Sequence, residues 1–216
     1  MNVYCISGMG VDHRLFQNLR LRGCKMHFIS WNTPLKGETL PDYAIRLSDA
    51  IDKTQPFVLI GVSFGGMCST EIAKQLNPVK TFIISSCKKG EELPGAVRIW
   101  EYFPVHKLLN NKMLISGAMA LKGRFGVNTR EAAILFDDML RTAPENYYKR
   151  AIDCIVCWRN SEVPQNLVHI HGDADKLIPI RQIKCDHIIK GGSHFMVMDK
   201  AVEISEIINN ELARFS

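Results

Sequence analysis

A serine, two aspartates and a histidine each follow an apolar run of strand length. Ser63 lies in GVSFGG, between the run 56–62 and a helix expected over 65–77. The acids lie in HGDADKLIP (171–179), and His194 lies in GGSHF, each after a further run of this kind. A serine hydroxyl becomes a strong nucleophile when a histidine takes its proton and a carboxylate fixes the histidine's tautomer. The order Ser, Asp, His therefore predicts nucleophilic chemistry, although small residues around Ser63 also suit an ordinary strand-to-helix turn.

The elements that must position these side chains form an alternating pattern. Continuous apolar runs separated by amphipathic segments predict a parallel sheet that is covered by helices on both faces. The carboxyl ends of such strands meet at one edge, which would bring Ser63, the acids and His194 together. The expected strands are 2–7, 25–30, 56–62, 79–85, 166–172 and 185–192, and the expected helices of this part are 12–23, 41–53, 65–77 and 198–215.

The middle of the chain has a different pattern. Residues 88–165 contain no strand-like run but several helix signals, among them NTRE (128–131) and TAPE (142–145), which both match a capping box. Pro144 also suits a first helical turn. We therefore expect a helical cap over 88–165, inserted into a core that is made of 1–87 and 166–216.

Over essentially its whole length the chain resembles the α/β-hydrolase superfamily, as a compact member with a helical cap. The resemblance implies an α/β fold with a mostly parallel sheet of about six strands, because the family's usual first two strands are absent. In that family the acid often occurs as H-G-x-x-D-x-x-x-P, which matches His171, Gly172, Asp175 and Pro179. Asp175 is therefore the preferred acid. Asp173 remains its competitor, with turn formation as its other role.

The resemblance also implies an oxyanion hole that is built from two backbone N–H groups. One belongs to Phe64, directly after the serine, and the other to the loop that follows the first strand. By position, Met9 supplies this second N–H, and the glycines on either side of it permit the turn. Asp12, further along the loop, is expected to be a helix N-cap.

Composition excludes several other classes of function. Of 216 residues 46% are hydrophobic and 23% charged, and the net charge of +5 is spread along the chain without the clusters of a nucleic-acid surface. We see no secretory signal and no apolar run of membrane-spanning length, so we expect a cytoplasmic protein that does not bind membranes. The seven cysteines fit buried thiols, because Cys154 and Cys157 form a C-x-x-C without a partner motif. No histidine pair has metal-ligand spacing and no dinucleotide fingerprint is complete, so neither a metal nor a cofactor is expected.

These features together predict a serine hydrolase that cleaves a small carboxylic ester or thioester through an acyl-enzyme. Two alternatives stay open: a lyase or carbon–carbon bond hydrolase that uses the same triad, and a non-catalytic binding member of the fold. Residues 102–130 carry no acid but five basic side chains, which suit either an anionic substrate or acyl-carrier partner, or a solvated helical face. These five are Lys107, Lys112, Lys122, Arg124 and Arg130.

Overall fold

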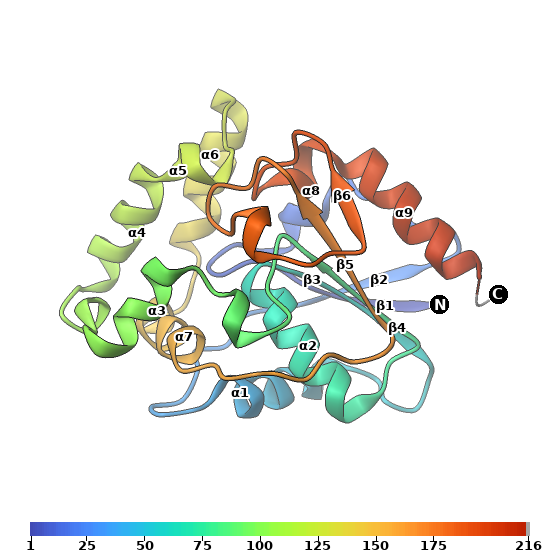
Figure 1. The fold of residues 1–216 in the computed structure, drawn as a ribbon, viewed down its shortest axis with the longest axis horizontal. Coiled ribbons are helices and arrows are strands. Elements are labelled where there is room, and N and C mark those ends of the chain that lie inside the picture. Colours follow the sequence, from blue (N-terminus) through green and yellow to red (C-terminus); the bar gives the residue numbers. More distant parts are fainter. Residues whose placement is uncertain (215–216) are drawn as a thin grey trace.

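Six strands form one sheet in the order β2-β1-β3-β4-β5-β6 in the computed structural model, which describes residues 1–214 (Figure 1). Every neighbouring pair runs parallel, so the predicted fold class is confirmed. The predicted closing helix reaches Phe215, which like Ser216 lies outside the described residues. The strands are β1 (Asn2–Ile6), β2 (Lys25–Ile29), β3 (Phe57–Val62), β4 (Lys80–Ile84), β5 (Leu167–Gly172) and β6 (His187–Ile189).

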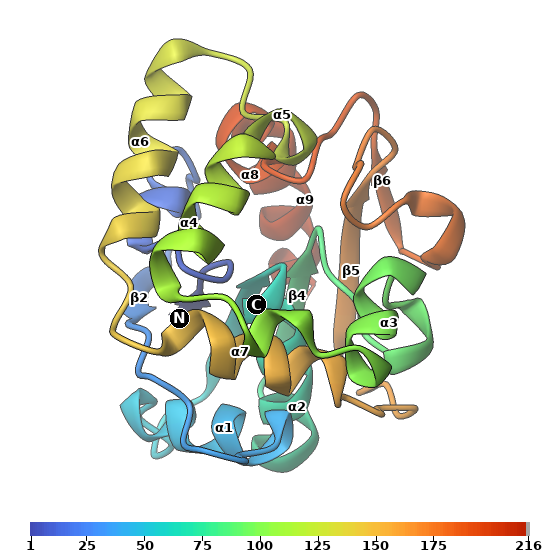
Figure 2. The ribbon, with the colours of Figure 1, turned by 90° about the vertical axis from the view of Figure 1, so that its left-hand side faces the viewer.

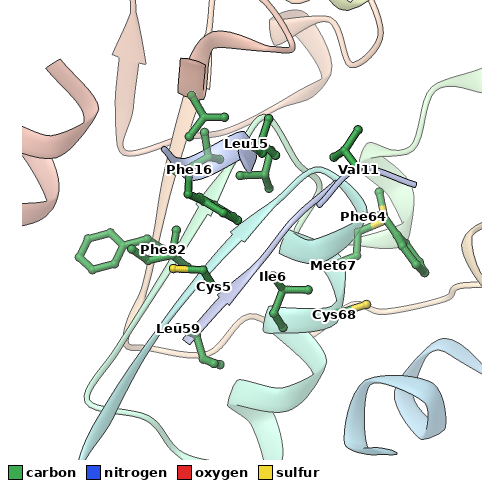
Figure 3. Close-up of a cluster of buried hydrophobic side chains, with 14 of the residues drawn as sticks. Cys5, Ile6, Val11, Leu15, Phe16, Leu59, Phe64, Met67, Cys68 and Phe82 are labelled. Atoms are coloured by element: carbon green, nitrogen blue, oxygen red, sulfur yellow. The ribbon is translucent and has the colours of Figure 1, made fainter. Parts of the chain in front are cut away.

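The central strands are apolar on both faces because each face carries its own core. Cys5 of β1 stands opposite Ile60 of β3, which in turn stands opposite Phe82 of β4, so these three side chains share one face. The next residue of β1, Ile6, points to the other face, where Met67 of the helix after β3 lies (Figure 3). Continuous apolar runs therefore become doubly buried strands.

Helices cover the two faces of the sheet separately (Figure 1). On one side lie α1 (Leu40–Leu47) and α2 (Phe64–Leu76); on the other lie α8 (Met196–Asp199) and α9 (Ala201–Ala213). The helix expected over 41–53 thus ends at Leu47 and continues only as a 3₁₀ turn. The 3₁₀ turns outside the cap are His13–Phe16, Ser48–Ala50 and Ile180–Gln182.

The helix expected over 12–23 is wrong, because only His13–Phe16 forms a helical turn, of the 3₁₀ type. Beyond Leu19, whose N–H still donates to Phe16 O (3.0 Å), the backbone bonds to side chains of α9. The Arg20 N–H donates to Ser205 Oγ (2.9 Å), and the Arg20 carbonyl accepts from Asn209 Nδ2 (3.0 Å). An amphipathic pattern that fits a helix can equally come from an irregular segment with one apolar side.

Between β4 and β5 the chain forms only helices and connections; the helices lie toward the carboxyl edge of the sheet, and the connection after α7 runs back to the start of β5 (Figures 1 and 2). The division at residues 88 and 165 into a core and a cap remains our proposal. The elements of this segment are a 3₁₀ turn (Gly90–Glu92), α3 (Gly95–Tyr102), a second 3₁₀ turn (Val105–Lys107), α4 (Asn111–Ala120), α5 (Lys122–Phe125), α6 (Arg130–Arg141) and α7 (Tyr147–Val156).

The two capping-box sequences of the cap behave differently from what we expected. The first is displaced by one residue, since Thr129 rather than Asn128 is the N-cap of α6. The second starts no helix. Thr142 instead ends α6 by donating its hydroxyl to Met139 O (2.7 Å), and α7 begins only at Tyr147.

Candidate active site

Ser63 occupies a strained bend between β3 and α2. Its φ of 53° and ψ of −120° lie outside the regions that residues with a Cβ normally adopt. The surroundings hold this conformation: the Ser63 N–H donates to Ile84 O (2.9 Å), and its carbonyl accepts from Gly66 N (2.8 Å) and Ser86 Oγ (2.7 Å). A serine that is kept in such a conformation by its neighbours is a candidate for function.

The glycines around Ser63 allow the chain to bend in this confined space. A Cβ at Gly65 would meet the backbone oxygens of Ile6 and Ser7, at the end of β1. A Cβ at Gly61 would meet the carbonyl of Gly65 itself. The end of β1 and the first turn of α2 therefore approach each other closely only because these positions lack side chains.

The structure brings together the three side chains that the sequence placed at three strand ends. His194 Nε2 lies 2.9 Å from Ser63 Oγ, and His194 Nδ1 lies 2.8 Å from Asp175 Oδ2. Asp175 follows β5 and His194 follows the adjacent β6, while Ser63 follows β3. Both Asp175 and His194 are buried, so the hydrogen bond that joins them is shielded from water.

Asp175 is fixed by its own loop as well as by His194. Its Oδ1 accepts from the N–H groups of Leu177 (2.8 Å) and Ile178 (2.9 Å). Burial alone would raise the pKa of this carboxyl group. The charge and hydrogen bond of His194, the Ile178 N–H and the neighbouring His171 outweigh burial and hold the pKa below its usual value. Asp175 is therefore ionised at neutral pH and can stabilise a protonated His194.

Asp173, the competing acid, does not contact His194. Its Oδ1 accepts from the Gly191 N–H (2.6 Å), in the turn that precedes His194, and the residue is exposed. The neighbouring His171 is buried, which lowers its pKa, and it bonds to Ile178 O through Nε2 (2.8 Å). Asp173 thus holds the turn before His194, and neutral His171 holds the loop of Asp175.

The loop after β1 lies beside Ser63, as an oxyanion loop must. A Cβ at Gly8 would stand 3.7 Å from Ser63 Cβ, and Gly10 has a φ of 74°. Within residues 1–214, neither the Met9 N–H nor the Phe64 N–H donates to another group of the protein. Both groups are therefore available to an oxygen that is bound next to Ser63.

Two aromatic residues at the site were missed by sequence reasoning. The ring of Phe125, in α5, lies edge-on to His194 with 5.8 Å between the ring centres, and its carbonyl accepts from the Phe195 N–H. Trp31 follows β2 and bonds through its ring nitrogen to the loop that contains Met9. Its place at the end of a strand was the one signal that could have drawn attention to it.

A cavity of about 200 Å³ opens between the loop after β1 and the connection from α6 to α7. It is lined on one side by Gly10 and Val11, and on the others by Trp31 and by residues 142–144. The cavity adjoins the proposed oxyanion loop, so a ligand there would touch both the core and the cap.

The five basic side chains of 102–130 do not form one cluster of free charges. Lys107 forms an ion pair with Asp153 (3.2 Å). Lys122 and Arg124 belong to α5, the short helix whose Phe125 faces His194. Lys122 and Arg124 therefore share a helix with a residue that contacts His194.

Among the described residues no three His, Cys, Asp or Glu side chains gather as metal ligands would, and no helix is both long and apolar enough to cross a membrane. The cysteines are free; Cys154 is buried and Cys157 is exposed.

Comparison with known proteins shows similarity of structure rather than of sequence. No family model and no curated protein matches the chain. An esterase from Thermogutta terrifontis, solved with malate bound, matches 99% of this chain and 90% of its own, with a TM-score of 0.71 and 15% identity. Est816, described as an N-acyl homoserine lactone degrading enzyme, matches 97% and 92%, with a TM-score of 0.70 and 15% identity. A lipase-esterase related protein from Clostridium acetobutylicum matches 97% and 93%, with a TM-score of 0.61 and 18% identity.

Proposed function

Because the chain has the α/β-hydrolase fold, we propose that it is a serine hydrolase that cleaves a small carboxylic ester or thioester. The observation that carries this proposal is the continuous hydrogen-bonded chain from Asp175 through His194 to Ser63, at a strained strand-to-helix bend. The similarity to esterases and other hydrolases supports the class of reaction at the level of the fold.

In the first half of the proposed reaction, Ser63 Oγ attacks the acyl carbonyl carbon while His194 Nε2 takes the hydroxyl proton. Asp175 accepts the hydrogen bond from Nδ1, which keeps Nε2 free to act as the base and stabilises the imidazolium that forms. The carbonyl oxygen becomes an oxyanion, and the Met9 and Phe64 N–H groups donate to it. His194 then protonates the leaving alcohol or thiol, which leaves the acyl group on Ser63.

In the second half, water replaces the leaving group. His194 Nε2 takes a proton from the water as it attacks the acyl carbon, and then returns that proton to Ser63 Oγ as the acid departs. The first turn of α2 points its N-terminus at the same place, which further favours the negative charge.

Hydrolysis of p-nitrophenyl esters and acyl-CoA thioesters tests the proposal and separates its two substrate classes. We expect turnover of at least one series and a loss of at least about a thousandfold in Ser63→Ala and His194→Ala, with the fold unchanged. Ser193→Ala is the matched control. Its hydroxyl precedes His194 in the chain and, within residues 1–214, bonds only to the Phe195 N–H, so its loss should change the rate less than about threefold. Turnover that survives in Ser63→Ala would contradict the proposal.

A further inference from the structure

Trp31 contacts both halves of the proposed oxyanion hole. Its Nε1–H lies 3.0 Å from Gly8 O and 3.0 Å from Val11 O, in the loop that contains Met9. Its indole also stacks on the ring of Phe64, with 5.3 Å between centres and 24° between planes. We propose that Trp31 is a positioning residue that keeps the Met9 N–H directed at the oxyanion; the inference rests on the proposed function.

The geometry of the peptide bond explains how a contact at Gly8 acts on Met9. The Gly8 carbonyl and the Met9 N–H belong to one planar, trans peptide unit, so they point in opposite directions. A donor that holds the Gly8 oxygen on the side of Trp31 therefore holds the Met9 N–H on the opposite side. The Val11 N–H donates to the same oxygen (3.2 Å) and supports this orientation.

The loop needs such a support because its sequence allows the peptide unit to turn over. Gly8 and Gly10 flank Met9, and glycine adopts many backbone conformations at little cost. A half-turn of the Gly8–Met9 unit would present a carbonyl oxygen to the oxyanion in place of an N–H. That half-turn would also break the bonds that Trp31 and Val11 make to Gly8 O.

The other end of the loop is held at the same indole. Val11 O accepts from Trp31 Nε1 and also from the Ser7 hydroxyl (2.6 Å), so both ends of the segment from Gly8 to Val11 are fixed by side chains. The hydrogen bonds to Gly8 O also polarise the peptide unit that Gly8 shares with Met9, which makes the Met9 N–H a better donor.

The indole itself cannot easily rotate away. Tyr43 stacks on both Phe64 and Trp31, with 14° and 12° between the ring planes, and its hydroxyl donates to Asn32 O (2.7 Å). Tyr147, a fully buried residue of α7, lies against the indole at 5.6 Å. Trp31 therefore aligns one amide through hydrogen bonds and the other through packing.

The test is Trp31→Phe, which keeps an aromatic ring and removes the N–H. We expect kcat for a p-nitrophenyl ester to fall roughly ten- to a hundredfold, somewhat less than the loss of a whole oxyanion donor, while KM changes less than about threefold. Affinity for a trifluoromethyl ketone, whose adduct with Ser63 carries an oxyanion, should fall by the same factor as kcat. A purely structural role would not make these two losses equal.

A second variant separates the N–H from the shape of the ring. 3-Benzothienylalanine at position 31 replaces the N–H by sulfur and should show the same paired losses; it decides the question if Trp31→Phe does not fold. Trp158→Phe is the matched control, because that indole N–H donates to buried Glu71 Oε1 (2.7 Å) on α2. This control should lose stability but keep kcat and ketone affinity.

The outcomes distinguish the inference from the proposed function. The positioning role is wrong if a folded variant at Trp31 keeps wild-type kcat and ketone affinity, or if only its KM changes. Either result would leave the proposed hydrolase function intact. A wild-type protein whose Ser63 does not react with the ketone would overturn the proposed function and this inference with it.

Discussion

Replacing Asp175 by asparagine tests how the candidate triad depends on one proton. Asp175 Oδ1 accepts from the N–H groups of Leu177 and Ile178, and Oδ2 faces His194 Nδ1. An asparagine oxygen can keep the first two bonds, which places its NH₂ group against Nδ1. Two donors would then face each other unless the imidazole moves its proton to Nε2. In that tautomer Nε2 carries a hydrogen and cannot accept the proton of Ser63.

The structure indicates which orientation of the amide prevails. Turning the asparagine over would sacrifice two hydrogen bonds, each worth about 1 kcal/mol, to restore one. The inactive tautomer is therefore favoured, and the variant also loses the negative charge that stabilises the imidazolium. We expect kcat to fall by about 10³ to 10⁴, which corresponds to about 4 to 5.5 kcal/mol in the barrier.

Ester hydrolysis under saturating substrate measures this loss, with Asp173→Asn as the matched control. Asp173 undergoes the same chemical change on the same loop, but its oxygen only accepts from the Gly191 N–H, which asparagine can also do. The control should stay within about threefold of wild type. Equal and small effects of the two substitutions would refute the reasoning and place the acid elsewhere.

Four further outcomes are expected. Combining Ser63→Ala with His194→Ala should cost little more than either change alone, because the two act as a unit; multiplying losses in kcat would show that they do not. Gly65→Ala should lower the free energy of unfolding by about 3 kcal/mol or prevent folding, since its Cβ meets backbone oxygens; a thermal melt within 2 °C or so of wild type would contradict this. Burial holds the pKa of His169 well below its usual value, so below about pH 6.5 the unfolded chain takes up a proton that the folded protein does not. The free energy of unfolding should therefore fall on acidification by up to about 1.4 kcal/mol per pH unit. Urea unfolding at pH 7 and pH 5.5 should show a smaller difference for His169→Leu; an unchanged difference would exclude this histidine as the source. Replacing Lys122 and Arg124 by glutamine should alter kcat/KM alike for a neutral and a carboxylate-bearing ester; a selective loss for the anion that disappears near 1 M salt would instead assign them to substrate binding.

The fold could be predicted because its strands are buried on both faces and therefore read as uninterrupted apolar runs. The run 56–62 predicted β3 to within one residue. A different rule, helical spacing of apolar residues, failed for 12–23, where such side chains face the core from a segment that bonds to α9. The spacing of apolar residues predicts which side chains are buried, but it does not predict which partners the backbone N–H and C=O groups bond to.

The candidate site could be located because each of its polar side chains follows a strand, and parallel strands end at one edge. Ser63, Asp175 and His194 are brought together there, and their catalytic roles remain our proposal. Trp31 could not be identified in the same way. It contacts a loop about 20 residues earlier in the chain, and an aromatic residue after a strand has no spacing that distinguishes it from a core residue.

The most direct test of the central claim is whether Ser63 is a nucleophile. The purified protein is treated with a fluorophosphonate, which forms a covalent adduct with activated serines, and the modified peptide is identified by mass spectrometry. We predict one adduct on Ser63, formed quickly in wild type, about a thousandfold more slowly in His194→Ala, and absent in Ser63→Ala. A folded protein that stays unlabelled, or that is labelled at another serine, would contradict the account.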